Sequence, residues 1–147
     1  MTSLVARALV SGTLAAVATT AAVAVAGRRT AGSYAAPVNA TSHALWGETA
    51  EHENKFTFKY TATGLALNHG ASVFWALFYE EFAGPRPSRK RALLGGALVS
   101  AVAYVVDYHL VPPRLTPGFE TRLPRKALGA TYAALAAGLC IRDLLKR

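Results

Sequence analysis

Four apolar runs, separated by short polar segments, dominate the pattern along the chain. They cover residues 4–26, 60–80, 91–111 and 125–143. A helix needs about 20 residues to cross a hydrocarbon core about 30 Å thick. The first three runs reach that length, and the fourth extends through flanking basic side chains that reach the headgroups. The pattern predicts an all-α, integral membrane four-helix bundle, with residues 1–147 as a single membrane domain.

The first run has two interpretations. Arg7 and the small residues at 24–26 are typical of a cleaved secretory signal. The run is longer than the usual apolar region of a signal, however, and its small residues recur at every fourth position, which favours a retained, closely packed helix. These positions are Gly12, Ala16, Thr20 and Ala24. The same spacing gives Gly129, Ala133 and Ala137 as the expected packing face of the last run.

The connection 28–59 is expected to be an interfacial loop or short helix, with an interfacial or re-entrant segment at 37–47. Leu45 and Trp46 give this segment an amphipathic character, and tryptophan is enriched at headgroup depth. Asn39, Ala40 and Thr41 match the N-glycosylation triplet, but they also suit a turn or a helix cap. Both interpretations of the triplet remain open at this stage.

Composition supports the membrane assignment. Hydrophobic residues make up 52% of the 147 residues and charged residues 16%, against about 25% charged in soluble domains. The net charge of +8 comes from basic residues that flank apolar runs. This placement predicts contact with the lipid bilayer and its anionic headgroups and argues against nucleic acid. A homo-oligomer or a partner in a membrane complex is also compatible with the close-packing faces.

Polar side chains inside the apolar runs are the candidate site. Asn68 and His69 lie at the middle of the second run, where polar groups are costly. If the second and third runs form a hairpin, His69 lies about 14 Å below one face, between the depths of Tyr104, about 10 Å, and Ser100, about 16 Å. Asp107, His109 and the loop residue His43 belong to the same half of the membrane. The predicted ligand-binding residues are His43, Asn68, His69, Tyr104, Asp107 and His109.

Several chemistries fit such a cluster. Histidines and Asp107 suit a metal, a haem or a proton path, yet no two histidines share a helix face. Alternatively the polar residues only fix the helix register, with Asp107 pairing with Arg114, Arg125 or Lys126.

Nothing in the sequence supports an enzyme. The single Cys140 excludes an internal disulfide and a cysteine-based zinc site, and no nucleophile motif or glycine-rich phosphate loop is present. Carboxylates such as Glu80 and Glu81 lie in polar flanks and are expected to be solvated. No catalytic residue, cofactor or metal ligand is predicted. The sequence favours a structural or interaction protein, with ligand, proton or haem/metal binding near His69 and Asp107 as the alternative.

Three motifs resemble a known family. The stretches GLALNHGASVFWALFYEEF, VDYHLVPPRLTPGFE and CIRDLLKR are similar in layout to the YagU-like family of small bacterial inner-membrane proteins. The chain departs from that layout in its N-terminal third and at Ile141-Arg142-Asp143, which has one arginine fewer. The resemblance implies a multi-pass inner-membrane protein and transfers no catalytic residue.

The orientation in the membrane follows from the basic residues. With four spans, these residues divide equally between the two sides of the membrane, and the dense cluster 89–91 in the shortest loop favours cytoplasmic termini.

Overall fold

The computed structural model describes residues 2–146, which fold into helices and connecting turns with no strand. The all-helical prediction is confirmed. Four long helices form the body: α1 (Leu4–Ala31), α5 (Thr63–Ala83), α6 (Arg89–Val105) and α7 (Arg125–Leu145). Shorter elements are α2 (Ala36–Thr41), α3 (His43–Trp46), α4 (Glu48–His52), the π-helices η1 (Phe58–Ala62) and η2 (Val106–Leu110), and the 3-10 turns η3 (Pro113–Leu115) and η4 (Phe119–Thr121). Arg147 of the C-terminal basic cluster lies outside the described residues.

Three of the long helices are long and apolar enough to span a membrane. They are Leu4–Ala31, Arg89–Leu110 and Arg125–Leu145. The helix α5 has 21 residues, but Asn68 and His69 at its centre and Glu80 and Glu81 near its end lower its hydropathy. Three candidate spans therefore support a membrane protein, and the fourth remains a prediction.

The helix α1 is longer than the sequence indicated. It continues past residue 26 to Ala31, with Arg28 and Arg29 in its last turn. Cations are favourable there because they face the negative end of the helix dipole. The helix then ends at Gly32, which adopts the left-handed conformation with φ of 69° that favours glycine. Arg28 and Arg29, which follow the predicted run 4–26, therefore belong to the C-terminal turn of α1.

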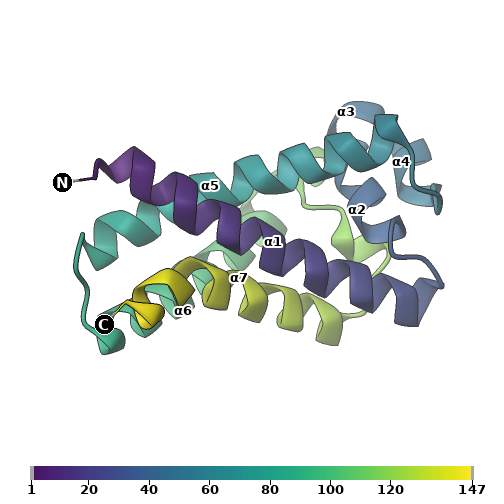
Figure 1. Ribbon diagram of the computed structural model, residues 1–147. Coiled ribbons are helices and arrows are strands. Elements are labelled where there is room, and N and C mark those ends of the chain that lie inside the picture. Colours follow the sequence, from purple (N-terminus) through teal and green to yellow (C-terminus); the bar gives the residue numbers. More distant parts are fainter. Residues whose placement is uncertain (1, 147) are drawn as a thin grey trace.

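The helix α1 lies between α5 and α7, and α6 packs mainly on α7 (Figure 1). Gly12 of α1 packs on α5, where an added Cβ would lie 2.6 Å from Val73 Cα. On α7 the expected face is wrong, because Gly129, Ala133 and Ala137 are exposed. The buried face instead carries Thr131, Leu135 and Gly138, and an added Cβ on Gly138 would meet the α1 backbone at Ala15.

Short helices, one of the two forms expected there, fill much of the connection 28–59. The whole of α2 is buried, so this part of the expected 37–47 segment is internal, while Leu45 and Trp46 are exposed. Asn39 is 0% exposed, and its amide nitrogen donates to the carbonyl oxygens of Glu53 at 3.0 Å and Lys55 at 2.8 Å. A structural role for the 39–41 triplet therefore fits the fold, and glycosylation of the folded chain does not.

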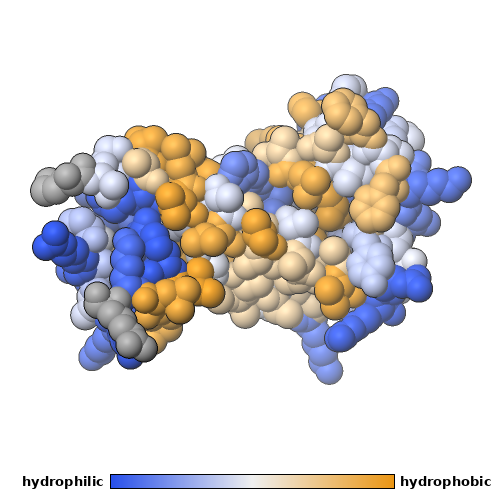
Figure 2. Space-filling model, in the orientation of Figure 1, coloured by the Kyte–Doolittle hydropathy of each residue, from blue (hydrophilic) through white to orange (hydrophobic). Residues whose placement is uncertain are grey.

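The two ends of the bundle differ from its middle. Both termini and the turn between α5 and α6 lie at one end, and α2, α3 and α4 cover the other (Figure 1). Apolar side chains cover much of the middle and hydrophilic side chains gather at both ends (Figure 2). Exposed apolar residues on α1, α5 and α6 include Val17, Phe74, Phe78 and Leu98. Such a belt is the surface expected to face lipid.

Candidate functional site

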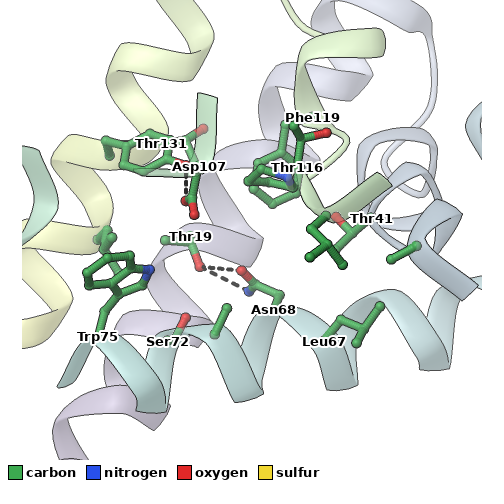
Figure 3. A pocket seen from close by; sticks show the side chains of 16 residues that line it. Thr19, Thr41, Leu67, Asn68, Ser72, Trp75, Asp107, Thr116, Phe119 and Thr131 are labelled. Atoms are coloured by element: carbon green, nitrogen blue, oxygen red, sulfur yellow. Dashed lines mark hydrogen bonds between the residues drawn. The ribbon is translucent and has the colours of Figure 1, made fainter. Parts of the chain in front are cut away.

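A cavity of about 220 Å³ lies between α5 and α7, beneath the short helices and the loop after η2. It is lined from α5 by Asn68, Ser72 and Trp75, from α7 by Tyr132, and from η2 by Asp107. Thr19 of α1 and loop residues including Thr116 and Phe119 complete the wall. Figure 3 shows the Asp107 carboxylate pointing into the space between Trp75, Thr19 and Asn68. Most of the lining is apolar, and a few polar groups converge on it, as is typical of small-molecule sites.

The π-helix η2 presents Asp107 to this cavity. Val111 N–H donates to Val106 C=O at 3.0 Å, which is the i to i+5 bond of a π-turn. Pro112 and Pro113 follow and stop the helix, because proline cannot continue the backbone hydrogen bonds. Three consecutive residues, 106–108, are half-buried on the widened turn. Short π segments are rare and often mark functional positions.

Asp107 has one hydrogen bond among residues 2–146. Tyr132 Oη donates to Asp107 Oδ2 at 2.6 Å. The predicted pairing with a basic residue is not present, since Arg114 donates instead to the carbonyl oxygen of Ala44 at 3.0 Å and no ion pair of the described residues includes Asp107. The carboxylate therefore enters the cavity without a positively charged partner.

Asn68 joins α5 to α1 beside the carboxylate. Its amide nitrogen donates to Thr19 Oγ1 at 3.0 Å, to Thr20 Oγ1 at 3.1 Å and to the carbonyl oxygen of Ala16 at 3.3 Å. Thr19 Oγ1 also lies 3.4 Å from Asn68 Oδ1. These contacts fix the orientation of the amide, so that a rigid polar wall faces the cavity.

Unpaired polar atoms lie just behind the lining. Tyr108 Oη and Glu120 Oε2 are buried and have no hydrogen-bond partner in the described part of the chain. The other oxygen of Glu120 accepts a hydrogen bond from Thr116 Oγ1, which lines the cavity, at 2.5 Å. The rings of Tyr104, Tyr108 and Tyr132 pack on one another, with centroids 5.1–5.9 Å apart. Buried polar groups without partners are rare in folded proteins and need an explanation.

The four histidines do not gather at the cavity. His69 is on the outer surface of α5, where Nε2 lies 2.8 Å from Thr13 Oγ1 of α1. His43 of α3 connects α2 to η3. Its Nδ1 lies 2.8 Å from the carbonyl oxygen of Ala40, and its Nε2 lies 3.2 Å from the carbonyl oxygen of Pro113. His109 is exposed and its ring packs near Tyr104. Of the predicted site residues, Asn68 and Asp107 line the cavity, and Tyr104 touches it only through Tyr132.

No group of three or more metal-ligating side chains occurs in the part of the chain that the structure describes. The metal alternative therefore has no ligand set to support it there. The neutral hydroxyls, the amide and the single lining carboxylate are better suited to hydrogen bonding with an organic molecule than to holding a transition metal.

A second polar cluster, which was not predicted from the sequence, lies at the end of the bundle with the termini. Glu80, expected to be solvated, is 0% exposed. Its two oxygens accept from Arg7 Nε at 3.0 Å and Arg142 Nη2 at 2.7 Å. Asp143 adds contacts to Arg142 at 3.0 Å and to Tyr79 Oη at 2.9 Å. Arg7 lies within an apolar run, which was the available signal that it has an internal partner.

Comparisons with protein-family models, curated proteins and solved structures find no match for this chain. The YagU-like relationship therefore stays a prediction, and function has to be argued from the site.

Proposed function

We propose that this protein is a four-span inner-membrane protein that binds a small molecule in the cavity between α5 and α7. The observation that carries the proposal is the convergence of Asp107, Asn68 and Thr19 on an otherwise apolar cavity of about 220 Å³. For comparison, an engineered apolar cavity of about 150 Å³ is large enough for benzene. The ligand is accordingly a compact molecule with an apolar body and a polar group.

The proposal includes α5 as the fourth span. Its 21 residues correspond to about 31 Å of helix, and it runs beside α1 (Figure 1). Phe74 and Phe78 are half-exposed on its outer side, as suits contact with lipid. Its polar residues Asn68 and His69 both have hydrogen-bond partners on α1, which reduces the cost of placing them in a membrane.

Both termini are placed in the cytoplasm, with the basic ends of the helices against anionic headgroups. The supporting feature is the cluster Arg89, Lys90 and Arg91 at the start of α6, at the same end as both termini (Figure 1), because short cytoplasmic loops are rich in Lys and Arg. Reporter fusions at each terminus test this orientation. Activity of a periplasm-specific reporter at either end would contradict it.

The cavity proposal is tested with benzyl alcohol as the probe and purified protein in detergent. Ser72→Leu fills the cavity, and Ala66→Leu places the same side chain on the exposed side of α5 as a control. Benzyl alcohol should raise the thermal midpoint of the wild type and of Ala66→Leu, and leave Ser72→Leu unchanged. A ligand at 100 times its Kd stabilises by about 2.7 kcal/mol. Equal shifts in all three proteins would overturn the proposal.

A second candidate is an interaction protein that docks another membrane helix. Thr13, Val17 and Thr20 of α1 and Leu65 and His69 of α5 line a shallow outer groove, and small residues allow helices to approach closely. If a second copy occupies this groove, Val17→Cys in a Cys140→Ala background should crosslink to a dimer in membranes. Val17 is 64% exposed, so a strictly monomeric product would exclude the symmetric pairing.

A further inference from the structure

We propose that the ligand is a primary organic ammonium ion whose charge faces Asp107; this rests on the proposed function of the cavity. Among residues 2–146, Asp107 is the one lining residue with a formal charge, and no Lys, Arg or His lines the cavity. The enclosed charge is therefore entirely negative. A cation is the complementary ligand, because a carboxylate removed from water is costly unless a positive group compensates it.

The carboxylate has an oxygen free for this purpose. Tyr132 Oη donates a hydrogen bond to Asp107 Oδ2 at 2.6 Å, whereas Asp107 Oδ1 receives no hydrogen bond from residues 2–146. An ammonium group has three donors and no acceptor. Asp107 Oδ1 can take one donor, and the oxygens of Thr19 and Asn68, which face the same space in Figure 3, can take others.

The surroundings strengthen the negative character of the site. Glu120 is a second carboxylate close to the lining, since it accepts a hydrogen bond from Thr116 Oγ1 at 2.5 Å, and its Oε2 is buried with no hydrogen-bond partner among residues 2–146. The nearby arginines are engaged elsewhere: Arg114 bonds to the Ala44 carbonyl, and Arg122 bonds to the Glu51 carbonyl at 2.8 Å and to Asn54 Oδ1 at 2.6 Å. Two half-buried carboxylates with no cationic partner among residues 2–146 leave a net negative charge that a cationic ligand can compensate.

The rest of the lining is suited to an organic cation rather than a hydrated inorganic one. Trp75, Phe119 and Tyr132 contribute aromatic rings to the wall, and aromatic rings attract organic cations as well as packing against an apolar body. Leu67 and Leu135 add aliphatic surface. A small inorganic ion would leave this apolar surface without contact and would find only one lining carboxylate.

The test compares two probes of equal size, benzylamine, which is protonated at neutral pH, and benzyl alcohol, which is neutral. Their affinities are measured by calorimetry on the purified full chain in detergent. Wild type should bind benzylammonium at least tenfold more tightly than benzyl alcohol. Asp107→Asn should remove that preference and keep the affinity for benzyl alcohol. Glu81→Gln, an exposed carboxylate on α5, is the matched control and should retain the tenfold preference.

Each other outcome decides a separate point. Equal affinities in the wild type, or a preference that survives Asp107→Asn, overturn the ammonium inference and leave the cavity function intact. No binding of either probe overturns the cavity function as well. Sodium ions that stabilise the wild type as strongly as benzylammonium overturn the organic ligand. If Asp107→Asn does not fold, Glu120→Gln is used; it should lower the preference, and an unchanged preference contradicts the inference.

Discussion

Glu80 on α5 and Asp107 on η2, which continues α6, are both carboxylates within one helical bundle, and their surroundings are opposite. Glu80 is fully buried between two arginines, 3.0 Å from Arg7 and 2.7 Å from Arg142. Asp107 accepts one hydrogen bond, from the Tyr132 hydroxyl, and lines the cavity. The charges at the ion-paired end compensate one another, whereas at the cavity we propose that a ligand supplies the compensating charge. Polar groups in a membrane bundle can thus serve cohesion or binding, and the partner set distinguishes the two roles.

The largest expected effect is at the ion-paired carboxylate. Glu80→Gln leaves Arg7 and Arg142 without their shared counter-charge, and breaking a buried pair from one side costs about 3–5 kcal/mol. The free energy of unfolding, measured by denaturant titration in mixed micelles, should fall by that amount. The same substitution at the exposed neighbour, Glu81→Gln, should leave it nearly unchanged. Equal losses in the two variants would remove the structural role assigned to Glu80.

The next effect tests whether the ion-paired end depends on close contact of α1 with α7. Gly138→Ala places a Cβ against the backbone of Ala15, and overpacking of this kind costs about 1–3 kcal/mol. Gly129→Ala is the matched change on the same helix, where an added Cβ meets no atom within 4 Å. Thermal midpoints of the two variants check the difference, and a tolerated Gly138→Ala would contradict the packing.

Replacing the carboxylate of Asp107 by an amide should change stability much less than the same replacement at Glu80. Asp107→Asn retains an acceptor for Tyr132 Oη and removes a half-buried charge that has no ion-pair partner among residues 2–146. We expect the unfolding free energy to stay within about 1 kcal/mol of the wild type, since removing both the charge and its desolvation is nearly neutral. The titration used for Glu80→Gln gives the comparison. A loss as large as that of Glu80→Gln would show that Asp107 is structural.

The smallest effect is expected at His69, which lies outside both regions. His69→Ala removes one hydrogen bond to Thr13, 2.8 Å long, and such interhelical bonds contribute about 0.6 kcal/mol on average. Binding of benzyl alcohol should be unchanged, because His69 does not line the cavity. An absorption spectrum and metal content that change with this substitution would restore a cofactor role for His69.

Hydropathy predicted the helices well because apolar length depends little on neighbours. The end of α1 was missed because Arg28 and Arg29 can belong to a helix as readily as stop it. The face of α7 was assigned wrongly because alanine recurs around the whole helix, so that four-residue spacing does not single out one side. Only the contacts with α1 select Gly138 over Gly129.

The sequence predicted how deep the candidate site residues lie along the helices, but not the direction in which their side chains point. Counting residues placed Asn68, His69 and Asp107 in one half of the bundle, yet Asn68 and His69 are consecutive and point about 100° apart on a helix of 3.6 residues per turn. Only one of the two can face the cavity. The buried state of Glu80 was hidden for another reason, since its partners Arg7 and Arg142 are far from it in sequence and no local pattern links them.

The ion-paired end also bears on how the chain is made. Arg7, Glu80 and Arg142 are separated by 73 and 62 positions, and synthesis proceeds from the N-terminus at about 5–20 residues per second. The helix α1 is inserted first, although its final place is between α5 and α7. Glu80 acquires its second arginine only when the last helix emerges. Completion of the ion-paired cluster therefore waits for α7, and a chain cut before Arg142 would leave Glu80 with Arg7 as its one arginine partner among the described residues.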